Sequence, residues 1–72
     1  LEPSAAEPWL LRARALSLLG DRAAAARDIQ EALRLEPRHF GALLTLSELQ
    51  EDAGDLQGAL RSLDAALALH PR

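Results

Sequence analysis

Two histidines and five hydroxyl side chains are the residues of this chain that could act as a base or a nucleophile. The chain has no cysteine, and His39 and His70 each lie within two residues of a proline. Hydrolytic or transfer chemistry requires a nucleophile, a base and a charge-stabilising group within hydrogen-bond reach. No such pattern accompanies the hydroxyl residues, which are Ser4, Ser17, Thr45, Ser47 and Ser62. We therefore predict no catalytic residue and interpret both histidines as solvated turn residues.

Residue types that bind phosphate, metal or nucleic acid are equally sparse. The glycines never form a phosphate-binding run, and no Cys/His cluster is spaced for zinc. A net charge of −3 argues against nucleic acid, which needs concentrated basic charge. No apolar run reaches the roughly 20 residues that span a bilayer. We therefore expect no cofactor, no metal, no nucleic acid and no membrane, and the absence of cysteine fits a cytoplasmic as well as an exported protein.

The chain instead repeats itself at a fixed period. Pro3, Pro37 and Pro71 are evenly spaced, and shifting the sequence by that spacing gives 13 identities in 38 comparisons. The identities include turn residues such as Gly20 and Gly54 as well as apolar residues. A period of about 34 residues is typical of stacked-repeat proteins, in which each unit buries its apolar face against its neighbours.

Turn residues divide each repeat into two helical segments. The Gly-Asp pairs at 20–21 and 54–55 each combine a C-cap glycine with an N-cap aspartate, and a proline ends each second segment. Ser4 and Glu7 resemble a capping box at the start of the first segment. Apolar residues recur at three- and four-residue spacing, as on one face of a helix. The predicted helices cover residues 6–19, 22–36, 40–53 and 56–70, without strands.

These features resemble the tetratricopeptide repeat family, whose unit is a helix–turn–helix of about 34 residues. In that family a bulky residue stands early in the first helix, a glycine at the turn, alanines in the second helix and a proline at the end. The matching residues are Trp9, Gly20, Ala25, Ile29, Ala32 and Pro37 in one repeat, and Leu43, Gly54, Ala59, Leu63, Ala66 and Pro71 in the next. The resemblance implies an all-α, right-handed superhelical solenoid of four antiparallel helices.

The resemblance also implies how the chain is divided. Residues 1–5 would end a preceding repeat, residues 6–39 form one repeat and residues 40–72 form the second, so the chain is expected to be a piece of a longer protein. Trp9 is expected to fill the core, and Phe40 to pack between the repeats. Gln50 stands where the family favours an aromatic residue, which predicts weaker packing in the second repeat.

In this family the first helix of each repeat lines a concave groove that binds peptides or partner helices. The residues placed there by the resemblance are Glu7, Leu10, Arg14, Ser17 and Leu18, followed by Gly41, Leu44, Glu48, Glu51 and Asp52. Spacing of four and seven residues within each set supports one helix side. Leucines at 10 and 44 replace the cationic and polar residues of the family's carboxylate clamp, so that clamp is not expected.

The groove residues favour a peptide or helix of another protein as the partner. The leucines suit an apolar or amphipathic segment, whereas Glu48, Glu51 and Asp52 suit a basic segment unless Arg14 pairs with Glu48. The first repeat carries a net charge of +1 and residues 40–72 a net charge of −3. We therefore predict a protein-interaction scaffold without catalysis of its own.

Exposed apolar residues on the last helix predict self-association. Leu60, Leu63 and Leu67 are expected to be partly bare, so copies of the chain would form a homo-oligomer through these faces. Two other interpretations of the chain stay open at this point. One is a purely structural self-association module, and the other is a regulatory segment of a larger enzyme.

Overall fold

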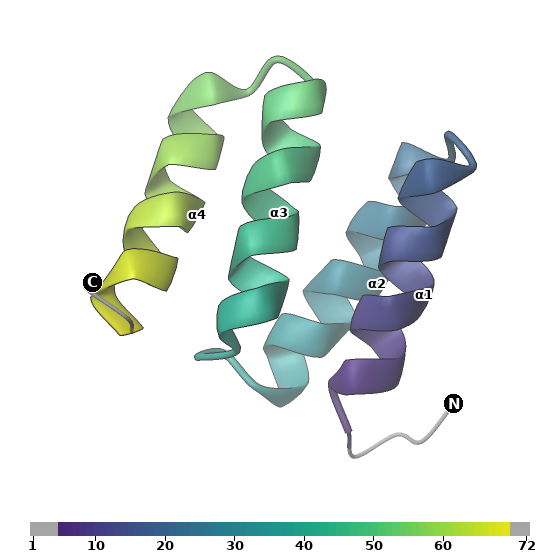
Figure 1. Cartoon of the computed structure of the whole chain (residues 1–72), viewed down its shortest axis with the longest axis horizontal. Helices are drawn as coiled ribbons and strands as arrows, with labels where there is room; N and C mark the ends of the chain where they lie inside the picture. Colours follow the sequence, from purple (N-terminus) through teal and green to yellow (C-terminus); the bar gives the residue numbers. More distant parts are fainter. Residues whose placement is uncertain (1–4, 70–72) are drawn as a thin grey trace.

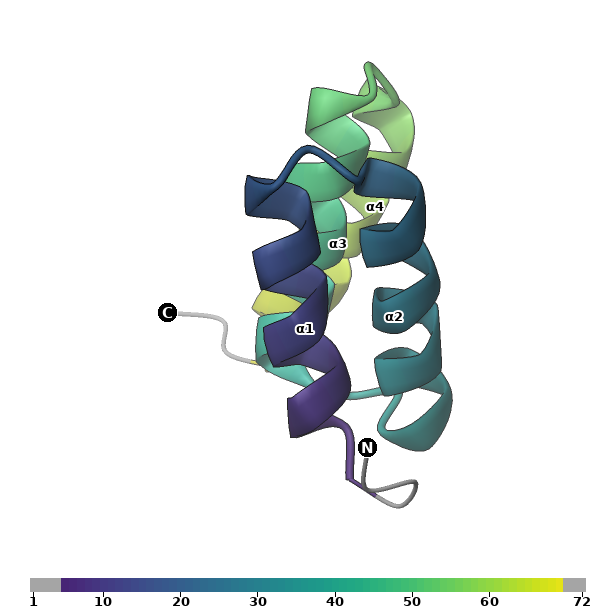
Figure 2. The same cartoon turned by 90° about the vertical axis from the view of Figure 1, so that its right-hand side faces the viewer.

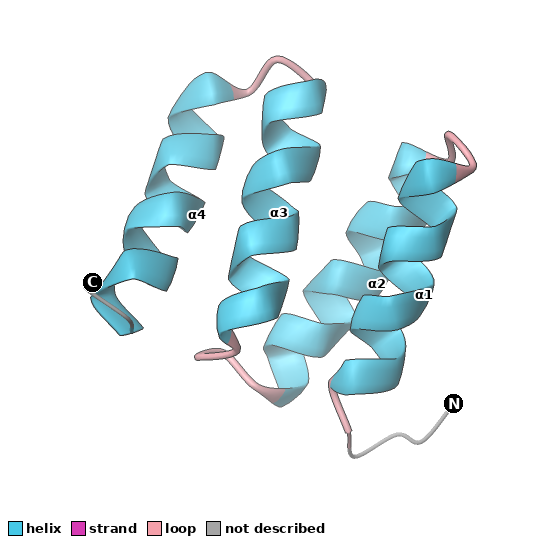
Figure 3. Cartoon of the chain, viewed as in Figure 1, coloured by secondary structure: helices cyan, strands magenta, loops and turns pink. Residues whose placement is uncertain are grey.

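The computed structural model describes residues 5–69, which form four helices. Helix α1 spans Glu7–Leu18, α2 spans Arg22–Leu35, α3 spans Phe40–Asp52 and α4 spans Leu56–Leu69. None of these bounds differs by more than one residue from the predicted one, and the predicted last residue, His70, lies outside the described part of the chain. No strand occurs within residues 5–69 (Figure 3). The prediction of an all-α fold is confirmed.

The helices are arranged as two antiparallel pairs that stack side by side. Helix α1 packs with α2, and α3 packs with α4 (Figure 1). Helix α3 contacts both helices of the first pair, and Figure 2 shows the second pair behind the first. The interface between the repeats is therefore formed by α3 on one side and by α1 and α2 on the other.

Each helix pair turns at a glycine in the left-handed region. Gly20 has φ +91° and Gly54 has φ +86°, a conformation that costs other L-residues energy. The amides of Asp21 and Asp55 then donate to carbonyls five residues earlier, at 2.9 and 2.8 Å, which satisfies the helix end. Both aspartate side chains accept a hydrogen bond from the amide three residues later, at 3.2 and 2.9 Å. The predicted glycine and aspartate caps are confirmed.

The start of α1 differs from the predicted capping box. Helix α1 begins at Glu7, its N-cap is Ala6, and no side chain among the described residues makes a capping hydrogen bond there. Ser4 lies outside the described residues. The capping-box prediction is wrong, because the acid of a capping box stands at the third helical position and Glu7 stands at the first.

The core is built where α1, α2 and α3 meet. One buried cluster contains Leu10, Ala13, Ala25, Ile29 and Leu49, and a second contains Ala6, Ala32 and Ala42. Ile29 is the largest side chain that is fully buried. The alanines let the helices approach closely, and half-buried Trp9 packs against the second cluster, as predicted.

A buried polar contact joins the two helices of each repeat, and its members on α2 and α4 occupy equivalent repeat positions. Asp28 on α2 is 6% exposed and accepts hydrogen bonds from Nε and Nη2 of Arg12, at 2.7 and 3.0 Å. The hydrogen bonds to Asp28 raise the pKa of Arg12 above its usual value. Ser62, the equivalent of Asp28 in the second repeat, donates to Oε1 of Gln50 at 2.6 Å. Gln50 thus has a partner on α4, which the prediction of weaker packing did not include.

Candidate functional site

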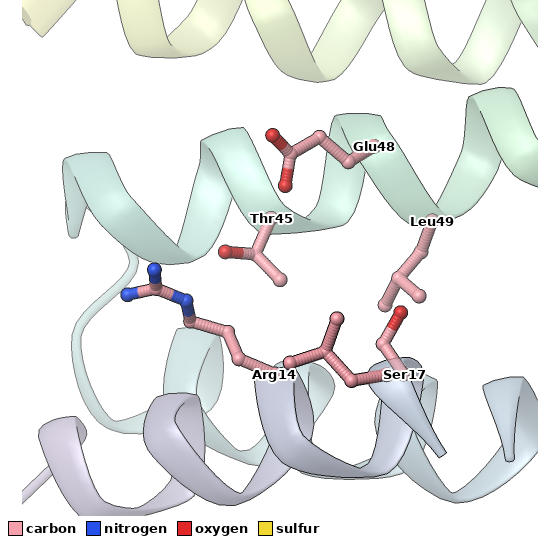
Figure 4. Close-up of a pocket in the computed structure, with 6 residues that line it drawn as sticks. Arg14, Ser17, Thr45, Glu48 and Leu49 are labelled. Atoms are coloured by element: carbon pink, nitrogen blue, oxygen red, sulfur yellow. The ribbon is translucent and has the colours of Figure 1, made fainter. Parts of the chain in front are cut away.

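A hollow of about 230 Å³ lies between α1 and α3, on one side of the helix stack. Its lining consists of Arg14, Ser17 and Leu18 from α1 and Thr45, Glu48 and Leu49 from α3 (Figure 4). The two helices belong to different repeats, so this hollow exists only where one repeat stacks on the other. We call it the α1–α3 groove.

The two charged residues of the α1–α3 groove occupy equivalent positions in the two repeats. Arg14 and Glu48 are one repeat period apart, both are exposed, and they extend from opposite walls (Figure 4). Among residues 5–69 the ion pairs between permanently charged groups are Arg12–Asp28 and Arg34–Glu31, so the Arg14–Glu48 pair that the sequence left open is not formed. The groove therefore offers a cation on one wall and an anion on the other.

Uncharged side chains complete the α1–α3 groove. Thr45 and Ser17 bring hydroxyl groups that can donate or accept a hydrogen bond, while Leu18 and Leu49 supply apolar surface. Thr45 is buried at the base of α3's wall, and Leu18 is 91% exposed. The arrangement suits recognition of a chain segment with both polar and apolar groups.

Leu10 was predicted to line the groove but belongs to the core. It is 3% exposed and lies in the buried cluster with Ile29 and Leu49. Gly41 lies close to Leu10, since a Cβ atom there would come within 3.2 Å of Cδ2 of Leu10, a tighter contact than most. The correction follows from the facing helix: α3 passes directly over Leu10 and covers it.

The other predicted residues are distributed over different surfaces. Arg14, Ser17, Leu18 and Glu48 line the α1–α3 groove, as described above. Leu44 is half-buried, and Asp52 is exposed at the end of α3. Glu51 lines a second hollow between α3 and α4. The three leucines predicted for self-association, Leu60, Leu63 and Leu67, are all exposed.

Sequence reasoning missed Thr45 and Leu49. Their equivalents in the first repeat are Leu11 and Ala15, both exposed on α1, so the internal repeat carries no signal for them. Thr45 and Leu49 face the groove only because α3 has a preceding repeat to pack against. Contacts of this kind come from stacking and not from the repeat pattern.

His39 connects the two walls of the groove at the start of α3. Its Nδ1 accepts a hydrogen bond from the amide of Ala42 at 3.0 Å, which caps α3. Its Nε2 lies 3.2 Å from Oε1 of Glu7 on α1. Because Nδ1 accepts, Nε2 carries the ring proton and donates to Glu7. The side chain is 19% exposed, so the interpretation of His39 as a solvated turn residue is wrong.

His39→Ala is expected to lower the free energy of unfolding by about 1–2 kcal/mol, because it removes the N-cap of α3 and the link to Glu7. His39→Asn is the matched control, since asparagine caps helices well but lacks the second ring nitrogen. Urea denaturation followed by circular dichroism measures both variants. Equal losses in the two variants would contradict the capping role.

The chain matches a known repeat family and a known repeat protein. The sequence model of the tetratricopeptide repeat family matches residues 6–39, which the proline spacing assigns to the first repeat. A TPR repeat-containing protein of Rhizobium etli is 34% identical over 71 residues, which cover 99% of this chain and 35% of that relative. The chain therefore contains a tetratricopeptide repeat, at residues 6–39. It spans about a third of the length of this relative.

Tetratricopeptide repeats generally mediate protein–protein interaction and are generally not catalytic. In the described part of this tetratricopeptide repeat chain, no helix combines the length and apolarity needed to cross a bilayer. Nor does that part group three His, Cys, Asp or Glu side chains as a metal site. The α1–α3 groove is therefore the candidate site for a protein partner.

Proposed function

We propose that this tetratricopeptide repeat chain is a non-catalytic scaffold whose α1–α3 groove binds a short segment of a partner protein. The observation that carries this function is the pair of facing charges, Arg14 and Glu48, which are not paired with each other. Two exposed charges of opposite sign across a hollow leave both available to a ligand. Charge-assisted hydrogen bonds of this kind are stronger than neutral ones and fix the orientation of the bound segment.

The groove chemistry favours a segment that carries both charges around an apolar residue. An acidic side chain or a terminal carboxylate suits Arg14, whose guanidinium can make two parallel hydrogen bonds. A lysine or arginine suits Glu48, and an apolar side chain suits the surface of Leu18 and Leu49. Such a partner is amphipathic, and its apolar contacts would be with Leu18 and Leu49, because Leu10 is covered.

Acid–base catalysis has little support in this groove. Neither Ser17 nor Thr45 has a histidine beside it among the residues of the lining. His39 uses both ring nitrogens in contacts with Ala42 and Glu7. Binding without chemistry is therefore the function that these side chains support best.

Selection of peptides from a displayed random library on the immobilised chain tests this function. Peptides that bind the groove are expected to lose affinity about tenfold or more with either Arg14→Glu or Glu48→Arg, a loss of about 1.4 kcal/mol. Arg27→Glu is the matched control, because Arg27 is equally an exposed arginine but lies on α2, which contributes nothing to the groove. Isothermal titration calorimetry gives the affinities.

Two results would overturn the proposed function. One is a selected peptide whose affinity is unchanged in both groove variants. The other is an equal loss with Arg27→Glu, which would indicate a general charge effect and not a site. Circular dichroism of each variant establishes that its helices are intact before the affinities are compared.

A further inference from the structure

The start of α3 is tied to both helices of the first repeat through His39. Nδ1 of its ring accepts a hydrogen bond from the amide of Ala42 at 3.0 Å, and Nε2 donates to Oε1 of Glu7 on α1 at 3.2 Å. Its backbone amide donates to the carbonyl oxygen of Glu36, the C-cap of α2, at 3.1 Å. The side chain is 19% exposed, and the ring packs against Gly41, where a Cβ atom would lie 3.3 Å from Cε1. One side chain therefore caps α3 and joins the two repeats.

The hydrogen bond that caps α3 requires the neutral form of the imidazole. A neutral ring has one acceptor nitrogen and one donor nitrogen, whereas a protonated ring has two donors. Protonation places a hydrogen on Nδ1, which then faces the N–H group of Ala42, and two donors cannot bond to each other. Turning the ring over does not restore the cap, because the carbon atom Cδ2 then takes the place of Nδ1. Protonation of His39 therefore removes the N-cap of α3.

The dipole of α3 and the carboxylate of Glu7 act on a protonated ring in opposite directions. His39 stands at the N-terminus of α3, where the positive end of the helix dipole disfavours a cation. Glu7 attracts a cation, but its side chain is 60% exposed, so water and salt screen the attraction. Glu7 therefore offsets part of the cost of protonation.

The other charged groups around His39 lie at the end of α2 and in the turn that follows it. The carboxylate of Glu36 attracts a protonated ring, although its Oε2 already accepts a hydrogen bond from the amide of Ala6 at 3.4 Å. Arg38 is exposed beside His39 in the chain and repels a protonated ring. On α4, the five described residues after Asp64 are uncharged. Glu36 and Arg38 have opposite signs, so their effects largely cancel.

Loss of the cap outweighs the attraction of Glu7. An N-cap hydrogen bond changes the folding equilibrium about fivefold, and a cation at a helix N-terminus costs about twofold or more. An exposed ion pair recovers about fivefold at most and usually less. The neutral ring is therefore the form that the folded chain favours.

We propose that His39 makes the junction between the two repeats sensitive to pH. The folded chain favours the neutral ring, so the unfolded chain takes up more protons and stability rises with pH. Histidine changes its charge between about pH 5 and pH 8. The contribution of the cap is complete at the upper end of this range and is lost as the pH falls through it. Acid then releases the first turn of α3 from α1, and this release requires no ligand in the α1–α3 groove.

Urea denaturation of the whole chain at about pH 8 and about pH 5 tests the proposal. His39→Asn is the matched control, because asparagine caps helices well and does not titrate. His70 and the acids are present in both chains, so their own titrations cancel in the comparison. Between the two pH values the folding equilibrium constant of the wild type is expected to fall about threefold more than that of His39→Asn.

Glu7→Gln separates the cap from the charge that opposes it. Glutamine keeps an oxygen that can accept from Nε2 but no longer attracts a protonated ring. In chains that carry Glu7→Gln, the extra fall caused by His39 is therefore expected to grow to about fivefold or more. The amide resonance of Ala42 reports the cap directly by NMR. It should shift together with the titration of the His39 ring, and should not shift in His39→Asn.

Three results would overturn the proposal. One is an equal pH dependence of stability in the wild type and His39→Asn. Another is a wild type that loses less stability in acid than His39→Asn, which would mean that the attraction of Glu7 exceeds the loss of the cap. The third is a ring that nitrogen NMR shows to carry its proton on Nδ1 at about pH 8, because that tautomer cannot accept from Ala42.

Discussion

Ile29→Ala is expected to lower the free energy of unfolding by about 2–5 kcal/mol. Ile29 is fully buried, and its side chain fills the space where α1, α2 and α3 meet. Truncation removes apolar contacts and leaves a cavity that the surrounding helices can only partly close. Small domains have a total stability of the same order, so a substantial fraction of this variant should be unfolded at room temperature.

Leu63→Ala provides the matched control for this prediction, because it truncates the equivalent residue of the second repeat. Leu63 is 38% exposed, since no described helix covers α4 as α3 covers α2. Truncation of Leu63 should therefore lower the free energy of unfolding by a clearly smaller amount, about 1 kcal/mol or less. Urea denaturation at a concentration where the chain is monomeric measures both variants. Equal losses would contradict the assignment of the core to the interface between the repeats.

Arg12→Leu is expected to lower the thermal midpoint by roughly 5–10 °C, the response of a domain of this size to the loss of one strong interaction. Asp28 is 6% exposed, and both of its carboxylate oxygens accept hydrogen bonds from Arg12. Without Arg12 the carboxylate stays buried with neither bond. The guanidinium also lies 5.2 Å from the centre of the Trp9 ring, and that contact is lost as well.

Two further variants separate the buried charge from other effects of this substitution. Arg12→Leu/Asp28→Ser copies the residues at the equivalent positions of the second repeat, Leu46 and Ser62, and removes the buried charge. This double variant should recover more than half of the decrease in the thermal midpoint. Arg12→Lys keeps the positive charge but cannot make the bidentate hydrogen bonds, so an intermediate thermal midpoint is expected. A double variant as unstable as the sum of its single changes would contradict a coupled pair.

Local sequence signals were sufficient to predict the helices of this chain. Glycine at 20 and 54 allows a left-handed backbone, and the following aspartates cap the next helix, so each turn is specified by adjacent residues. Proline at 37 ends α2 for an equally local reason. The repeat period then indicated that the helix pairs stack. It also indicated the resemblance to the tetratricopeptide repeat family.

The groove itself was only partly predictable. Arg14 and Glu48 both line the hollow, and repeat position and helix spacing determine which side of a helix a residue faces. Leu10 was misplaced, since spacing alone does not say how far the facing helix extends over that side. In the structure α3 passes close to Leu10 at Gly41 and covers it.

The sequence by itself determined the four helices, the aspartate caps of α2 and α4 and the pairing of the helices, since these depend on residues close together in the chain. Only the tertiary structure decided which apolar residues are covered, that Thr45 and Leu49 complete the α1–α3 groove, and that His39 bonds to Glu7 32 residues away. Burial and long-range hydrogen bonds depend on the distance and angle between helices. Those quantities are fixed by the packing of many side chains at once, and no single spacing in the sequence contains them.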